Sequence, residues 1–146
     1  EGGTRSPLII HWPNGIASNQ IGSLVKDVCH VIDIMPTLLD VAGVTAGIQN
    51  SLPLEGRSFA NALQGLAVPQ HNSIFWAHNK GSAVWSDGWK LVSGNRGKQW
   101  ELYYLPEDGT ELKNLAVQHP DKVAELKELH AQWMARNKRV AGSTKK

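Results

Sequence analysis

The stretch from Val31 to Gly43 constrains the fold most, because it carries a helix start, an apolar face and a helix stop. Asp33 is placed to cap the first turn. Pro36 lies in that turn, where its missing N–H costs little because the first N–H groups of a helix have no partner within the helix. Gly43 favours a left-handed end. The apolar face comprises Met35, Leu38, Leu39 and Ala42. So short a helix must pack on a larger body, which predicts a cost of about 1 kcal/mol for Asp33→Ala and roughly 2–5 kcal/mol for Leu38→Ala.

Composition narrows the class of protein. The chain has 146 residues, 41% of them hydrophobic, and a net charge of +2 from 15 basic and 13 acidic residues. This balance is typical of a globular domain and does not indicate a nucleic-acid partner. No apolar run reaches the roughly 18 residues of a membrane span. Cys29 is the only cysteine, so an internal disulfide and a cysteine-based metal cage are excluded.

Two extended segments precede the helix. The apolar run Pro7–Trp12 predicts a strand buried on both faces, as in a parallel sheet covered by helices. The second segment is Leu24–Ile32, which contains Cys29 and His30. Neighbours on a strand point to opposite faces, so these two do not form a thiol–imidazole pair. We expect Cys29 to be a small buried filler and His11 a core or sheet-edge residue.

The second half favours a different layer. A short helix beginning near Ser58 and ending at Gly65 leads into a polar linker. Strands are predicted at Ser73–Trp76, on both sides of the Asp87-Gly88 turn, and at Trp100–Leu105. They fit a small antiparallel sheet covered by a final helix from about Pro120 to Arg136. The helix stripe comprises Val123, Leu126, Leu129 and Trp133, and Asn114-Leu115 would hold the preceding loop.

These landmarks, in this order, resemble the type I, formylglycine-dependent sulfatase family of the alkaline-phosphatase-like superfamily. They are Glu1-Gly-Gly-Thr-Arg-Ser-Pro, Trp12-Pro13, Asp33 to Gly43, Leu54-Glu-Gly-Arg-Ser-Phe, Phe75-Trp76, Asp87-Gly88-Trp89-Lys90-Leu91, Glu101-Leu102-Tyr103 and Asn114-Leu115. The resemblance extends from Glu1 to about Arg136. It implies an α/β fold in which residues 1–68 end the large catalytic domain and residues 69–146 form a small C-terminal subdomain. Because the chain starts without Met and enters an apolar run at once, we expect it to be a fragment.

The resemblance implies a sulfate-ester hydrolase that uses formylglycine and Ca²⁺. Formylglycine arises from a Cys/Ser-x-Pro/Ala-x-Arg motif, whereas Cys29 is followed by His30, Val31 and Ile32. The family's calcium ligands and catalytic Lys are expected upstream of Glu1. We therefore assign no catalytic or metal-binding residue here and expect the chain alone to be inactive, to bind no Ca²⁺ tightly and to self-associate.

A wall of the substrate pocket is the remaining expectation. Many bacterial relatives read Glu-His-Glu-Gly-Asn-Arg-Ala at the active-site mouth, where this chain has Ala77 to Ala83, reading Ala-His-Asn-Lys-Gly-Ser-Ala. His78 matches, and with Asn79 it is the candidate substrate contact; a strand-end histidine bonded to a turn is the alternative. Ala77 and Ser82 lack the carboxylate and guanidinium. Glu1 and Arg5 are expected to brace the first turn as an ion pair.

Two other functions stay open. A phosphonate or phosphodiester hydrolase of the same superfamily would share this scaffold and differ in the nucleophile region. A carbohydrate-binding structural module would use some of the six Trp residues for stacking, although strand and helix positions favour their burial. The resemblance leaves the sulfated substrate, small molecule or glycan, and the cellular compartment undefined.

Overall fold

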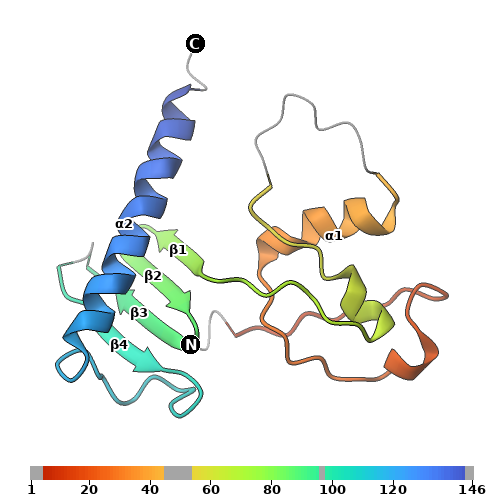
Figure 1. Ribbon diagram of the computed structural model, residues 1–146, viewed down its shortest axis with the longest axis horizontal. Coiled ribbons are helices and arrows are strands. Elements are labelled where there is room, and N and C mark those ends of the chain that lie inside the picture. Colours follow the sequence, from red (N-terminus) through yellow and green to blue (C-terminus); the bar gives the residue numbers. More distant parts are fainter. Residues whose placement is uncertain (1–4, 45–53, 96–97, 144–146) are drawn as a thin grey trace. The chain divides into compact units, whose positions relative to one another are not determined.

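The computed structural model describes residues 5–44, 54–95 and 98–143 (Figure 1). The chain divides into two compact units, Pro7–His71 and Asn72–Lys146 with Glu1–Ser6. The Glu1–Arg5 ion pair expected from the sequence involves Glu1, which lies outside the described residues. No helix in the described part of the chain is long and apolar enough to cross a membrane.

One unit contains a four-stranded antiparallel sheet. Its strands β1 (Ile74–His78), β2 (Gly81–Ser86), β3 (Trp89–Ser93) and β4 (Glu101–Tyr104) lie in chain order. The predicted two-residue turn joins β2 to β3, and both of its residues have positive φ, 48° at Asp87 and 78° at Gly88. The Asp-Gly dipeptide thus supplies the backbone that a tight hairpin requires.

The helix α2 (Pro120–Ser143) covers one face of this sheet (Figure 1). Val84, Leu91 and Leu102 lie opposite one another on β2, β3 and β4, and Leu126 of α2 completes a core whose four members are 0% exposed. Val123 and Leu129 pack against this core, and Trp133 stacks on Phe75 with ring centroids 5.2 Å apart. The predicted stripe is therefore confirmed, on a helix that extends beyond its predicted end at Arg136.

The loop between β4 and α2 is held as the sequence predicts. Asn114 Oδ1 accepts hydrogen bonds from the backbone N–H groups of Leu102, at 3.1 Å, and Ala116, at 2.9 Å. The N–H of Leu115 donates to the carbonyl of Leu102 at 2.8 Å, which closes the loop against β4. One amide side chain thus satisfies two backbone donors beside the core.

The other unit contains short helices. They are η1 (Ser18–Gln20), η2 (Val31–Asp33), α1 (Ile34–Val41) and η3 (Ala60–Gln64). Gly43 and Gly65 follow α1 and η3 with φ values of 67° and 72°, which confirms both predicted glycine ends. Gly56 passes so close to η2 that a Cβ there would lie 2.0 Å from the carbonyl oxygen of Ile32, so only glycine fits.

Three sequence-based predictions for the unit Pro7–His71 are wrong: its strands, the burial of Cys29 and His11, and the burial of the apolar face of α1. Pro7–Trp12 and the part of Leu24–Ile32 before η2 form no strand, because no described residue of Pro7–His71 supplies a paired neighbour. Cys29 and His11 are exposed instead of buried. The helix face is also uncovered, with Met35 and Leu38 exposed by 56% and 58%.

Candidate functional site

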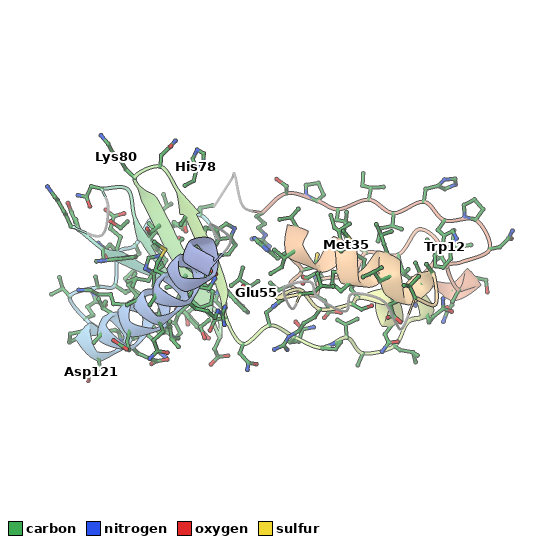
Figure 2. The ribbon with its side chains drawn as sticks, turned by 90° about the horizontal axis from the view of Figure 1, so that it is seen from above. Trp12, Met35, Glu55, His78, Lys80 and Asp121 are labelled. Atoms are coloured by element: carbon green, nitrogen blue, oxygen red, sulfur yellow. The ribbon has the colours of Figure 1, made fainter. Side chains whose placement is uncertain are left out.

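The predicted contact residues occupy the tip of the β1–β2 hairpin. His78 ends β1 and pairs with Gly81, the first residue of β2, so Asn79 and Lys80 make a two-residue turn. Asn79 has a φ of 52°, a left-handed conformation that asparagine tolerates better than most residues. Figure 2 shows His78 and Lys80 at the end of the hairpin, and His78, Asn79 and Lys80 are all exposed. The turn thus presents three polar side chains outward.

The tip can donate hydrogen bonds to an anionic group. Asn79 Nδ2 lies 2.9 Å from His78 Nε2, and an amide NH₂ can only donate, so Nε2 is the acceptor. A neutral His78 ring then carries its proton on Nδ1, where it can donate to a ligand. Lys80 adds an ammonium group beside it. The contact between His78 and the turn also matches the alternative expectation, a strand-end histidine bonded to its neighbour.

The structure relates the two positions at which the loop departs from the bacterial pattern. Ala77 and Ser82 are direct cross-strand partners in the β1–β2 register, with one residue pair between them and the turn. The resemblance implies a Glu at the first position and an Arg at the second. These two charges would therefore face each other across the hairpin, where opposite charges form a cross-strand pair. In this chain both charged positions of that cross-strand pair are uncharged, Ala77 and Ser82, whereas His78 is the same as in the bacterial pattern.

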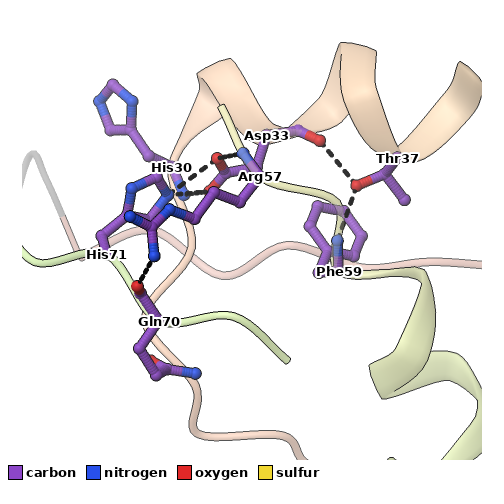
Figure 3. Close-up of polar contacts among 7 residues, drawn as sticks. All are labelled: His30, Asp33, Thr37, Arg57, Phe59, Gln70 and His71. Atoms are coloured by element: carbon purple, nitrogen blue, oxygen red, sulfur yellow. Dashed lines mark hydrogen bonds and ion pairs between the residues drawn. The ribbon is translucent and has the colours of Figure 1, made fainter. Parts of the chain in front are cut away.

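A second polar cluster is buried in the unit Pro7–His71 and centres on Asp33 (Figure 3). The Asp33 carboxylate is 2% exposed and accepts from the backbone N–H groups of His30, at 2.7 Å, and Arg57, at 2.8 Å. Nε2 of His71, a residue 9% exposed, lies 2.8 Å from both carboxylate oxygens. The carboxylate thus caps the short helix η2 and makes no capping hydrogen bond to α1. The sequence-based prediction that Asp33 caps the main helix is therefore wrong.

Backbone contacts extend this cluster. The Thr37 hydroxyl donates to the carbonyl of Asp33 at 2.7 Å and accepts from the N–H of Phe59 at 3.0 Å. The Arg57 guanidinium donates to the carbonyl of Gln70. Burial lowers the pKa of the His30 ring, and His71 adds to the lowering while the Asp33 charge opposes it. Three separate stretches of the chain, around Asp33, Arg57 and His71, thereby meet at one carboxylate.

An Asp–His pair can orient a catalytic imidazole, but this pair is not arranged for attack. Both oxygens of Asp33 accept hydrogen bonds from buried or partly buried donors, and within the described residues the His71 ring bonds to Asp33 and to no serine or cysteine. Although Cys29 is exposed as a residue, partial desolvation of its thiol and then the charges of Asp33 and Asp27 raise its pKa, so it is not an activated nucleophile. The cluster is therefore structural.

Sequence reasoning missed His71, Arg57 and Thr37 as partners of Asp33. His71 is 38 residues from Asp33, and Arg57 is 24 residues from it, so no local spacing links them. The one available signal is the polarity of the linker in which His71 lies, and that polarity indicated only a connection between layers.

The described residues do not fit the metal implied by the family resemblance. No three His, Cys, Asp or Glu side chains among them gather so that they could hold a metal ion. Asp108 lies in an acidic turn together with Glu107 and Glu111. Its carboxylate accepts from the N–H groups of Leu112, at 3.0 Å, and Lys113, at 2.8 Å, and these bonds lower the pKa of Asp108.

The chain is an α/β module. One unit is an antiparallel four-stranded sheet covered by a helix, and the other consists of short helices with an exposed apolar surface. The described residues contain no complete catalytic centre. The family model described as "N-sulphoglucosamine sulphohydrolase, C-terminal" matches residues 1–139. The chain belongs to this family, the C-terminal part of sulfatases.

Individual relatives agree. A sulfatase from Formosa agariphila is 27% identical over 97% of this chain and 29% of its own length. Human arylsulfatase K is 29% identical over 83% of this chain and 24% of its own length. The solved structure of a 2-O GAG sulfatase is 27% identical with a TM-score of 0.59, over 76% of this chain and 26% of that one. The chain therefore spans less than a third of the length of these relatives.

Proposed function

We propose that this chain is the C-terminal part of an enzyme that hydrolyses sulfate esters, in which it supplies one wall of the substrate site. The observation that carries the proposal is the family match over residues 1–139, supported by sulfatase relatives from bacteria and animals. By the same resemblance, formylglycine and Ca²⁺ would belong to the part of the enzyme outside this chain. The sulfatase names of the relatives do not favour a phosphodiester hydrolase or a separate carbohydrate-binding module.

The proposed reaction is tested in the longer protein that contains this chain. We expect it to release sulfate from a chromogenic aryl sulfate or a sulfated glucosamine, and to leave the matching aryl phosphodiester unhydrolysed. A preference for the phosphodiester would favour the other branch of the superfamily. Loss of activity with a calcium chelator, restored by added Ca²⁺, would support the metal that the resemblance implies; activity that the chelator leaves unchanged would contradict it.

We propose His78 and Asn79 as substrate contacts within that enzyme. They lie at an exposed hairpin end, they are coupled by a 2.9 Å contact, and Lys80 adds a positive charge beside them. A sulfated glycan offers the anionic and hydroxyl groups that such donors bind. The expected substrate class is therefore a sulfated sugar, with the tip contacting groups next to the ester that is cleaved.

Kinetics of the longer enzyme separate contact from structure at the tip. His78→Ala should raise KM for a sulfated glycan, and it should leave turnover of a small aryl sulfate unchanged, because that substrate lacks the neighbouring sugar groups that the tip is proposed to contact. Asn79→Gly keeps the left-handed backbone while it removes the amide, so it should raise KM less. Lys113→Ala, at an exposed position in another loop, is the control. Equal KM values for His78→Ala and the control would overturn this assignment.

We propose that residues 1–68 belong to the end of a large α/β domain and residues 69–146 to a C-terminal subdomain. The exposed apolar side chains support this, since nearly all of the large ones lie in the unit Pro7–His71. The most exposed there are Ile9 at 88%, Leu24 at 85%, Ile21 at 72% and Val31 at 70%. Patches of this kind mark interaction surfaces. In the longer protein this surface would pack against the rest of the enzyme.

In the isolated chain we propose that a second copy covers the same surface. Light scattering at high micromolar concentration should then give about twice the monomer mass. Ile9→Lys should return the mass to that of a monomer, because a charge in an apolar interface is costly. Val117→Lys, at a position 93% exposed in the other unit, should leave the dimer intact. A wild-type chain that scatters as a monomer would refute self-association.

A further inference from the structure

His130 is a buried histidine on α2 that belongs neither to the hairpin tip nor to the Asp33 cluster. The residue is 9% exposed. Its ring makes an edge contact with Trp100, with centroids 5.4 Å apart and planes at 70°, and a tilted contact with Trp133 at 6.0 Å. Trp133 in turn stacks on Phe75 of β1. These aromatic contacts connect α2 with both the first strand and the residues just before β4.

The polar atoms of this imidazole have an unusual environment. Nε2 is buried and has no hydrogen-bond partner among the described residues. A neutral ring can tolerate this by placing its proton on Nδ1, whereas the imidazolium would carry a buried N–H with no acceptor. Burial, with no other cause, lowers the pKa of His130 below its ordinary value.

The surrounding charges offer the imidazolium little compensation. On α2 itself the adjacent charged residues, Lys127 and Glu128, are exposed, and so is Lys98 in the segment before Trp100. The strand register places Phe75, Val84, Leu91, Leu102, Trp89 and Tyr104, together with Ala77, Ser82, Ser86 and Ser93, on the face that α2 covers, and none of these residues carries a charge at neutral pH. Trp100 and Trp133 could attract a cation through their ring faces. Burial acts against the charged ring and is the cause that lowers the pKa of His130.

We propose that His130 is an acid-sensitive anchor of α2, whose protonation weakens the packing of the helix on the sheet. A histidine with a lowered pKa in the folded state stabilises the fold above its ordinary pKa of about 6.5, and that stability is lost as the pH falls through the folded-state value. The free energy of unfolding of the sheet unit would therefore be highest at neutral pH and would decrease in mild acid.

The test follows two observables in the 146-residue chain between about pH 7.5 and pH 5, the range in which histidines titrate. Urea midpoints are measured for the wild type, for His130→Phe, which keeps an aromatic ring but cannot take a proton, and for His11→Gln, which removes an exposed histidine. The midpoints of the wild type and His11→Gln should fall in parallel with acid, and that of His130→Phe should fall less. An equal fall in all three would overturn the proposal.

The second observable does not require any variant to fold. The proton resonance of the His130 ring, followed by NMR in the wild type, should give a pKa below the ordinary value near 6.5. The total tryptophan fluorescence of the wild type, to which Trp100 and Trp133 contribute, should fall at the same pH, since a protonated imidazole beside an indole quenches it. A pKa at or above the ordinary value would refute the anchor, whatever the urea midpoints show.

Discussion

His71 places its Nε2 atom 2.8 Å from both carboxylate oxygens of Asp33, although 38 residues separate the two in the chain. The same carboxylate accepts the N–H groups of His30 and Arg57. Asp33 is therefore the point at which the start of the helical segment, the residues after position 55 and the end of the unit are joined. Its role exceeds that of the single helix cap expected from the sequence.

Asp33→Ala should cost about 3–5 kcal/mol of unfolding free energy, the range for removing one partner of a buried ionic and hydrogen-bonded group. The reason is that the buried His71 ring and the partly buried N–H groups of His30 and Arg57 lose their acceptor at once. Urea unfolding followed by circular dichroism measures the change, with Asp27→Ala at an exposed position as the control. A loss near 1 kcal/mol, equal to one helix cap, would show that the donors find other acceptors.

Leu38→Ala should change the stability of this chain by no more than about 1 kcal/mol, as for other exposed positions. The sequence placed Leu38 in the core and predicted a larger cost than for Asp33→Ala, but the residue is 58% exposed. Leu91→Ala, at a position 0% exposed, is the comparison and should cost roughly 2–5 kcal/mol. A Leu38→Ala cost that matched the Leu91→Ala cost would mean that another surface covers α1 in solution.

Ala77→Glu combined with Ser82→Arg should stabilise the β1–β2 hairpin by roughly 0.2–1 kcal/mol more than the sum of the two single changes. The two positions are direct cross-strand partners, so the introduced charges would face each other. A double-mutant cycle from thermal unfolding gives this coupling, which should shrink at high salt. Coupling of zero at low salt would argue against the register between these strands.

Tyr103 should resist ionisation until strongly alkaline pH. Burial, and next the hydrogen bond that its hydroxyl donates to Glu101 at 3.0 Å, raise the pKa of Tyr103 to about 12. Because the folded-state pKa is raised, the resulting stability is present below the ordinary value of 10.0 and is lost as the pH rises through about 12. Phenolate absorbance of the wild type minus that of Tyr103→Phe isolates this step. A difference titration centred near 10 would contradict the burial of the ring.

Local signals in the sequence predicted the sheet unit well. The Asp87-Gly88 turn, the stripe around Leu126 and the loop anchor Asn114 depend on neighbours within a few residues or on one amphipathic helix. The Pro7–His71 unit was harder to predict. A continuous apolar run such as Pro7–Trp12 indicates a strand only when neighbouring strands are present, and the described part of this unit contains none.

The candidate site divides in the same way. The resemblance placed His78 in the loop that follows the Phe75-Trp76 strand, and the structure has it at the end of the β1–β2 hairpin. The contacts of Asp33 with His71 and Arg57 could not be predicted, because contacts between distant segments leave no periodic pattern in a single sequence. His130 was likewise hidden, since its position on α2 is set by the packing of Trp100 and Trp133 around it.

The central claim is that this chain is a supporting part of a sulfatase and holds neither its nucleophile nor its metal. The most direct measurement is sulfate release from a chromogenic aryl sulfate by the purified 146-residue chain with Ca²⁺ present, together with calorimetric titration of Ca²⁺ into the same sample. We expect turnover equal to the buffer blank and no tight binding, since a hard cation needs six or more oxygen ligands. Turnover above the blank, or micromolar affinity for Ca²⁺, would contradict the account.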